Sequence, residues 1–536
     1  MSQLHLGVND KPDIKEMICF GFQQAMLSIS GLLVYPFIIS NIVCAGAAAV
    51  QLRVQLISAT FVSCGLATIL QTTFGLRLSV LHGPAMAFLP PLLAYQKNND
   101  CPYGEYDEVP EENWIQRMRD IQGSLMAACF VFIAVGGTGI AGYLAELIGP
   151  ITIVPLMLLL CESIVPTIEE KLSLHWISLL MLVTVVLMAV YLENTKVSMF
   201  YYSTKKMEIV STKVRLFGQF PYLLSTIFAW LICFIMTVTN LEPENGQART
   251  DKNVTMTVLR QSSWIHIPLP FAYGTPKFVG GIFFGFVASC LASIIENIGS
   301  YDLLARTSHQ QPPPKDAINR AIAFEGIGSL IAAMTGVSSG VTTYAENIAL
   351  IHITRVASRS TMQFAGVVLI FLGLFSKFAA FLASIPDALI GGLLTMGISM
   401  IGGVALSNLQ MINLKLCRNL SIMGLAFLLG QITPLHFSKS PIQSSWPELN
   451  NILNMLLNIK MLVGGVIATL LDNTVPGATR EDRGFRKIST ATENGFKNDA
   501  YEFPEKLKRI MRKFPILQYI PLLPSSEMKK SENQQV

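Results

Sequence analysis

Long apolar runs recur along the chain, and they constrain its fold more than any other feature. A helix needs about 20 mostly apolar residues to cross a bilayer. Fourteen segments fit this requirement, at about 17–37, 54–74, 79–95, 121–143, 149–167, 173–192, 221–240, 277–297, 319–335, 338–356, 362–384, 387–406, 417–435 and 453–472. Only 14% of the residues are charged, against about 25% in a soluble domain. The sequence therefore predicts a multi-pass integral membrane protein.

The sparse charge and the scattered cysteines limit the classes of function. The formal net charge is +4 with no long basic block, so the chain has no electrostatic footprint for nucleic acid. The nine cysteines stand without a CxxC motif or a metal-ligand spacing. No nucleophile–base pair is visible either. We therefore expect no metal, no cofactor and no enzyme active site, and we interpret most cysteines as small apolar filler; only Cys101 lies in a polar loop.

Lysine and arginine are distributed unevenly between the loops, and this predicts the orientation in the membrane. The loops 193–220 and 302–320 and the tail 473–536 are basic, whereas segment 98–112 is acidic. An even number of spans places both termini on one side. The N-terminus, 1–16, and the tail are therefore expected in the cytoplasm.

A glycosylation sequon agrees with this orientation. Asn253, Val254 and Thr255 form it in the loop 241–275, which the charge rule places outside. We expect Asn253 to be glycosylated. The first apolar run begins near Met17 and leads into further spans, so it is interpreted as a signal-anchor rather than a cleaved signal peptide. The plasma membrane is the expected location.

Two stretches interrupt helical regularity where spans are expected. Residues 80–88 contain a Gly-Pro pair, and residues 336–344 are rich in Gly, Ser, Thr and Val. Broken backbone at membrane depth is tolerated where it is buried in protein or lines a polar cavity. Both stretches fall in the third span of a seven-span half, and a repeat with an odd number of spans is inverted. Paired breaks of this kind indicate a transporter's binding site; ordinary kinked helices are the alternative.

Two carboxylates stand where charge is expensive. Glu296 ends a long apolar run, and Glu346 follows the second broken stretch, beside Asn347. A carboxylate at membrane depth usually serves a pathway or a partner, although each could instead meet water at the interface. The start of a half-helix and the amide of Asn347 add hydrogen-bonding groups. Gln24 could equally form an interhelical hydrogen bond or contact substrate, and His82 is interpreted as a packed histidine.

Several strings resemble the nucleobase–ascorbate transporter family over about residues 13–490. The family signature, Gln/Glu/Pro-Asn-x-Gly-x-x-x-x-Thr-Arg/Lys, is matched by residues 346–355, which read ENIALIHITR. Other family-like strings are LQTTFGLRL, PPPKDAINRAI, IPDALIGG, GVALSNLQ, CRNLSIMG and LLDNTVPGATREDRG. Their order and spacing together make the resemblance specific.

The resemblance implies an all-α membrane fold of 14 spans in two inverted seven-span repeats, with short broken strands in spans 3 and 10. A core domain that carries substrate would comprise residues 17–143 and 277–384. A gate and dimerisation domain would comprise residues 149–240 and 387–472. The core would move against the gate as an elevator, in a homodimer, and substrate would sit between the two broken strands.

The resemblance also assigns substrate-binding residues. Glu296, Glu346 and Asn347 match the family's binding carboxylates and amide, and Ala87 and Phe88 match the strand that faces the ligand. The chain departs from the family at three positions. Gln24 replaces a histidine, Ser300 replaces an acid and Ala349 replaces the signature glycine. Gln24 and Ser300 stand at binding positions of the family, so the resemblance places them in the substrate site as well. The missing acid at Ser300 leaves the coupling ion, H⁺ or Na⁺, open, with Glu296 and Glu346 as its candidate sites.

The carboxylate at Glu346 favours a nucleobase as the substrate. Ascorbate is an anion, which a second carboxylate repels unless it is protonated, whereas a neutral base presents N–H donors beside carbonyl acceptors. We therefore expect ion-coupled symport of a uracil- or xanthine-type base. The alternatives are a sodium-dependent ascorbate transporter of the same family and a non-transporting relative that acts as a sensor or partner subunit.

Overall fold

The chain folds into a helical bundle whose longest helices have the length and composition of membrane spans. The computed structural model describes residues 4–104, 107–203, 208–243, 246–485 and 500–503. Within these ranges, nine helices are long and apolar enough to cross a membrane. They are α1 (Ile14–Ile42), α2 (Ala49–Thr73, after a 3-10 turn at Gly46–Ala48), α4 (Glu111–Gly137), α6 (Pro150–Ser173), α9 (Pro221–Val238), α11 (Gly280–Thr307), α12 (Lys315–Met334), α16 (Asp387–Leu409) and α17 (Cys417–Lys439).

The other expected spans consist of shorter pieces. Segment 79–95 contains β1 (His82–Pro84), a 3-10 turn (Met86–Phe88) and α3 (Leu89–Asn98), and segment 338–356 contains β4 (Val341–Thr343) and α13 (Ala345–Thr354). The remaining pieces are α7 (Trp176–Val186) with a π-helical turn (Leu187–Tyr191), α14 (Arg359–Leu374), α15 (Ser376–Ala383), α18 (Pro447–Leu457) and α19 (Lys460–Thr474). The helical class is thus confirmed, while fourteen crossings and the inverted repeat stay predictions.

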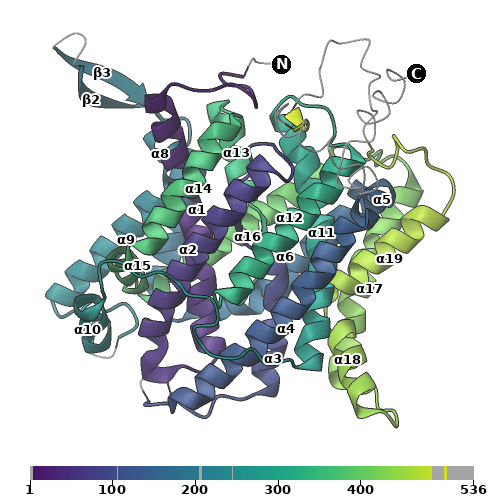
Figure 1. Cartoon of the computed structure of the whole chain (residues 1–536), viewed down its shortest axis with the longest axis horizontal. Helices are drawn as coiled ribbons and strands as arrows, with labels where there is room; N and C mark the ends of the chain where they lie inside the picture. The colour runs from purple at the N-terminus through teal and green to yellow at the C-terminus, as the bar shows by residue number, and fades with distance from the viewer. Residues whose placement is uncertain (1–3, 105–106, 204–207, 244–245, 486–499, 504–536) are drawn as a thin grey trace, which may run out of the picture.

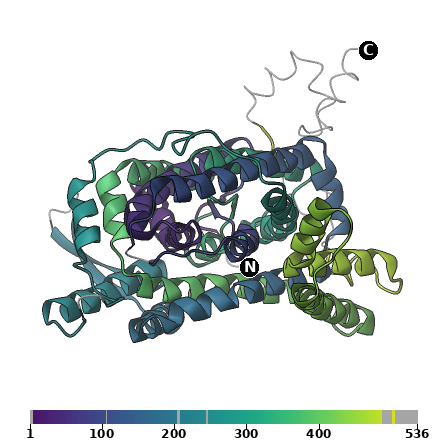
Figure 2. The same cartoon turned by 90° about the horizontal axis from the view of Figure 1, so that it is seen from below.

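Helices from both halves of the chain pack together in one group. The pairs α2–α14, α4–α12, α1–α14 and α4–α11 are all in contact, as the view in Figure 2 shows for the purple, blue and green helices. Small residues allow the closest of these approaches. A Cβ on Gly65 of α2 would lie 2.5 Å from the carbonyl oxygen of Gly366 on α14, so neither backbone leaves space for a side chain there.

A second group contains α6, α7, α9, α16, α17 and α19. The contacts α6–α16, α7–α16, α17–α19 and α6–α19 hold it together, and α17 to α19 form one flank of the molecule (Figure 1). Short helices connect or flank the two groups. They are α5 (Ile140–Leu147), α8 (Leu216–Gln219) and α10 (Asn253–Gln261).

The expected all-α fold, with short strands in spans 3 and 10, lacks one element that the structure contains. Strands β2 (Val197–Ser203) and β3 (Glu208–Val214) pair antiparallel within the expected loop 193–220, and the hairpin projects from one end of the bundle (Figure 1). Its sequence is rich in β-branched and aromatic residues, which favour strands. The loop is long enough for these residues to pair outside the bundle.

The interpretation of the cysteines in apolar runs as filler is wrong for Cys44. Cys44 and Cys101 form a disulfide. The bond joins the end of α1 to the segment that follows α3, so it closes a 57-residue separation in the sequence. Sequence spacing alone did not indicate this pair, because Cys44 follows a long apolar run and only the fold brings it to the polar segment.

Both ends of the described chain meet at the start of α14. The backbone N–H of Arg359 donates to Val8 O at 3.1 Å, and its Nη2 donates to Ala500 O at 2.8 Å. Arg320 of α12 donates to Tyr501 O at 2.8 Å. These bonds hold two terminal segments on the same group of helices. Most of the predicted tail, 486–499 and 504–536, lies outside the described residues.

Candidate functional site

The two interrupted stretches predicted from the sequence lie side by side and pair with each other. Strand β1 pairs antiparallel with β4, with His82 opposite Thr343 and Pro84 opposite Val341. The N–H of Tyr344 donates to Leu81 O at 3.0 Å and extends the ladder. Each strand is followed by a helical segment, so two chain breaks that lie far apart in sequence form one local structure.

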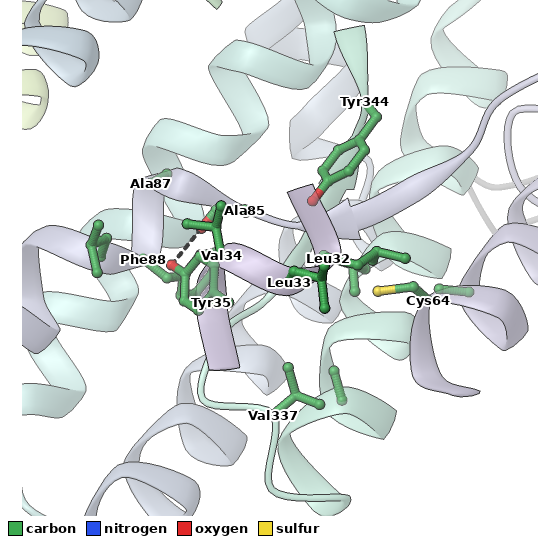
Figure 3. Packing of buried hydrophobic residues seen from close by; sticks show 14 of the residues in the cluster. Leu32, Leu33, Val34, Tyr35, Cys64, Ala85, Ala87, Phe88, Val337 and Tyr344 are labelled. Carbon is green, nitrogen blue, oxygen red and sulfur yellow. Dashed lines mark hydrogen bonds between the residues drawn. The ribbon is translucent and has the colours of Figure 1, made fainter. Parts of the chain in front are cut away.

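Glycine at position 83 allows this pairing. A Cβ at Gly83 would overlap the ring of Tyr344, and that ring also fills the space beside Gly31 of α1. Figure 3 shows Tyr344 pointing toward α1 near Leu32. Close approach between the strand and its neighbours therefore requires residues without side chains at these positions.

A cavity lies where the strand pair meets the second helix group. Glu296 and Ser300 of α11 and Glu346 of α13 line it together with Thr342, Thr343 and Tyr344 of β4. The opposite wall comes from α6 and α16, and it consists of Met157, Leu393, Leu394, Gly397 and Ile401. The fold thus brings three of the predicted site residues to one cavity between the two helix groups.

The two carboxylates of the cavity differ in their surroundings. Glu296 is 6% exposed, and its Oε2 has no hydrogen-bond partner within the described chain. Glu346 is half-buried and faces α16, where a Cβ on Gly397 would lie 3.9 Å from its Oε1. An unpaired buried carboxylate oxygen is costly, so Glu296 presents an acceptor that a ligand donor would satisfy.

Asn297 attaches the strand to α11 beside Glu296, a role that no pattern in the sequence predicts. Its Oδ1 accepts hydrogen bonds from Thr342 Oγ1 at 3.0 Å and from the Thr343 N–H at 3.2 Å. Its Nδ2 donates to Ser293 at 3.2 Å on the same helix. The amide therefore attaches α11 to β4 and sets the distance between Glu296 and the strand.

Asn347 and Gln24 contact each other and do not line the cavity. Asn347 Nδ2 donates to Gln24 Oε1 at 2.6 Å and to the Gln24 carbonyl at 3.1 Å. Both side chains are buried. The pair joins α13 to α1, which is the interhelical alternative considered for Gln24. Asn347 Oδ1 has no hydrogen-bond partner among the described residues.

Ala87 and Phe88 are likewise buried away from the cavity. The Phe88 ring packs against Phe286 with centroids 6.0 Å apart, and it lies under Gly340, where a Cβ would be 2.6 Å from the ring. Figure 3 shows Phe88 near Tyr35, whose hydroxyl donates to Ala85 O at 2.8 Å. In this structure Pro84 and Met86 are the residues of this stretch that line the cavity.

Comparison with known proteins identifies the family of this chain. The model Xan_ur_permease, described as "Permease family", matches residues 15–439. The chain is 34% identical to solute carrier family 23 member 2 of Rattus norvegicus, over 98% of this chain and 83% of that protein. It is 28% identical to nucleobase-ascorbate transporter 7 of Arabidopsis thaliana, over 90% of this chain and 89% of that protein. The chain belongs to the nucleobase–ascorbate transporter family.

The predicted resemblance is therefore confirmed, and this family member is a transporter and not an enzyme. Among solved structures, the transmembrane domain of the cyanobacterium bicarbonate transporter BicA is similar at a TM-score of 0.40 and 12% identity, over 87% of this chain and 99% of that one.

The family signature, residues 346–355, runs along α13 and ends at Arg355, which has a left-handed backbone conformation. Glu346 thus stands at the cavity end of that helix, as the signature's position after a break predicted.

Asn253, the predicted glycosylation site, lies apart from the cavity. It is exposed and forms the first residue of α10. Thr255 of the same sequon is 9% exposed. Glycosylation stays a prediction.

Proposed function

We propose that this transporter carries a neutral nucleobase of the uracil or xanthine type by ion-coupled symport. The observation that supports this most is the charge of the cavity. Its described lining contains two carboxylates, Glu296 and Glu346, and no lysine, arginine or histidine. An anion would be repelled at such a site, whereas a base with paired N–H groups would donate hydrogen bonds to it.

The walls of the cavity support an elevator-type movement. Glu296 lies on α11 of the first helix group, and hydrogen bonds join α13 to α1 and β4 to α11 within that group. The facing wall from α6 and α16 is almost wholly apolar. An apolar wall forms few hydrogen bonds, so the first group can slide past it while the substrate stays bound to Glu296 and Glu346. We propose that residues 17–143 and 277–384 form the moving core and that residues 149–240 and 387–472 form the gate of a homodimer, with both termini cytoplasmic.

Uptake of labelled uracil, xanthine and ascorbate by cells that express the chain tests the proposal. We expect saturable uptake of a base, and we expect Glu296→Gln to reduce it at least tenfold, since one lost charge-assisted hydrogen bond costs about 1.5–3 kcal/mol. Glu169→Gln, an exposed glutamate at the end of α6, is the matched control. Surface protein must be equal in all variants.

Two other outcomes discriminate the alternatives. Uptake of ascorbate alone would refute the charge argument and favour an ascorbate carrier of the same family. Surface protein without uptake of any of the three compounds would favour a non-transporting relative. Repeating the assay with and without sodium, at acid and neutral pH, identifies the coupling ion.

A further inference from the structure

A second polar layer lies where the strand pair packs against α2, α11 and α12. It consists of His82 of β1, Glu325 of α12, Tyr301 of α11 and Gln71 of α2, and each side chain is 0% exposed. Four separate elements contribute to it. None of these residues lines the cavity. The sequence predicts a packed histidine at His82 and gives no separate signal for Glu325.

The bonding within this layer is incomplete. Tyr301 Oη donates to Glu325 Oε2 at 2.8 Å, and Gln71 Nε2 donates to Tyr301 Oη at 3.2 Å. His82 Nε2 lies 3.7 Å from Glu325 Oε1, which is too long for a hydrogen bond. In the described chain, neither ring nitrogen of His82 nor Oε1 of Glu325 has a hydrogen-bond partner.

The net charge of the buried pair favours the binding of one proton. With a neutral imidazole and an ionised carboxylate, the pair carries a charge of −1 in a fully buried position, which is unfavourable. One added proton makes the pair neutral overall, either as imidazolium with carboxylate or as imidazole with carboxylic acid. A small inward shift of His82 then also forms the missing hydrogen bond. The pair therefore has a site for one proton.

One further charged group acts on the pair. Glu325 and, on α11, Tyr301 are the titratable groups that face His82, and Glu296 on the same helix repels an ionised Glu325. This repulsion also favours the neutral, protonated state of the pair. Helix α2 presents the neutral Thr68, whose hydroxyl accepts from the His82 N–H at 3.0 Å, together with Gln71. Strand β4 presents Thr343 opposite His82, and the hydroxyl of Tyr35 on α1 is bonded to Ala85 beyond the strand.

The layer is connected to the cavity by one strand and one helix turn. Thr343 lines the cavity and is the ladder partner of His82. Tyr301 directly follows Ser300, which also lines the cavity and contributes no charge. A change in the charge of the pair therefore changes the electrostatic potential at Glu296, because the protein between them has a low dielectric constant. Loading a proton at the pair and loading substrate in the cavity are coupled by proximity.

We propose that His82 and Glu325 form a buried proton-binding pair that takes up one proton together with each substrate molecule. The inference rests on the proposed function and names its coupling site. The proton enters from water on the side to which the cavity opens and leaves to water on the other side. The pair changes from −1 to 0 and back in each cycle. An imidazole selects a proton rather than a sodium ion, which prefers oxygen ligands.

Purified transporter in liposomes separates coupling from transport. Counterflow of the labelled base at equal pH measures substrate exchange, and accumulation against an applied pH gradient measures coupling. We expect His82→Gln and Glu325→Gln to keep counterflow within about twofold and to lose accumulation. His352→Gln, an exposed histidine of α13, and Glu169→Gln are the matched controls. pH-driven accumulation in both pair variants, or accumulation that needs only sodium in the wild type, would overturn the proposal.

Two further measurements keep the proposal testable when a variant or the substrate assignment fails. If a variant loses counterflow, the pH dependence of its substrate affinity, measured on detergent-purified protein, tests the proposal. The dissociation constant of the wild type should change by up to about tenfold per pH unit for one linked proton, and that of the variants should not; an unchanged pH dependence refutes the pair. If the protein carries no base, the infrared difference spectrum between two pH values tests the pair without substrate. A protonation signal that is the same in the wild type and in both variants excludes proton binding at the pair.

Discussion

Asp472 offers the sharpest test of what holds the second helix group together. This residue lies near the end of α19 with its side chain 0% exposed. Its Oδ1 accepts from Arg418 Nη1 at 3.0 Å and from Arg483 Nε at 3.0 Å, and its Oδ2 accepts from Arg483 Nη2 at 2.8 Å. One buried charge thus joins the first turn of α17, the end of α19 and the segment after it.

The expected cost of Asp472→Asn follows from this geometry. Removing one partner of a buried ion pair costs about 3–5 kcal/mol, because the remaining charge is left uncompensated. The asparagine still accepts one hydrogen bond, and Arg483 retains Asn473 as a partner at 2.8 Å. We therefore expect a loss of about 3 kcal/mol in the free energy of unfolding, at the lower end of that range.

Asp251→Asn is the matched control, because Asp251 also binds one arginine with both oxygens but is 48% exposed. An exposed pair contributes about 1 kcal/mol at most. The hydrogen bond from Arg249 lowers the pKa of Asp251, so any contribution is present above the unfolded pKa of about 4 and is lost as the pH falls. Unfolding midpoints in detergent at neutral pH compare the variants. Equal shifts for both would refute the dependence on burial.

Three further perturbations follow from the structure. Cys44→Ser should lower the free energy of unfolding by about 4 kcal/mol, from the loop of 57 residues that the disulfide with Cys101 closes; a reductant that lowers the wild-type midpoint but leaves the variant unchanged would confirm the cause. Gly83→Ala should abolish transport and lower expression, since its methyl group overlaps Tyr344; a normally active variant would contradict the close strand approach. Phe503→Ala removes a ring that the Arg320 guanidinium faces at 4.5 Å, so we expect a loss of about 1–2 kcal/mol, and an unchanged midpoint would show that residues 500–503 contribute little stability.

The sequence was most informative where a local pattern has only one physical solution. Apolar runs of about 20 residues must be membrane helices in a chain with so few charges, because unsatisfied backbone groups cannot face lipid. Within the described residues, the nine longest helices lie where such runs were predicted. Breaks at 80–88 and 336–344 were visible for the same reason, since Gly, Pro and Thr interrupt apolar runs there. The family signature then located Glu346 at the start of a half-helix.

Only the tertiary structure decided which residues share a site. Glu296, Ser300 and Glu346 meet in one cavity, while Asn347 turns to Gln24 and Phe88 turns to Phe286. The directions of these side chains depend on how α13 and β1 pack against α1 and α11, and no local spacing encodes that packing.

The same limit applies to pairs that are distant in the sequence. The proximity of His82 to Glu325 and of Cys44 to Cys101 arises from contacts between segments that are far apart along the chain. The periodicity of a single segment reports its own helix or strand and which of its faces is apolar. The partner of a buried polar group is chosen by the assembled bundle, because only there do its unmet hydrogen bonds and its charge acquire a cost.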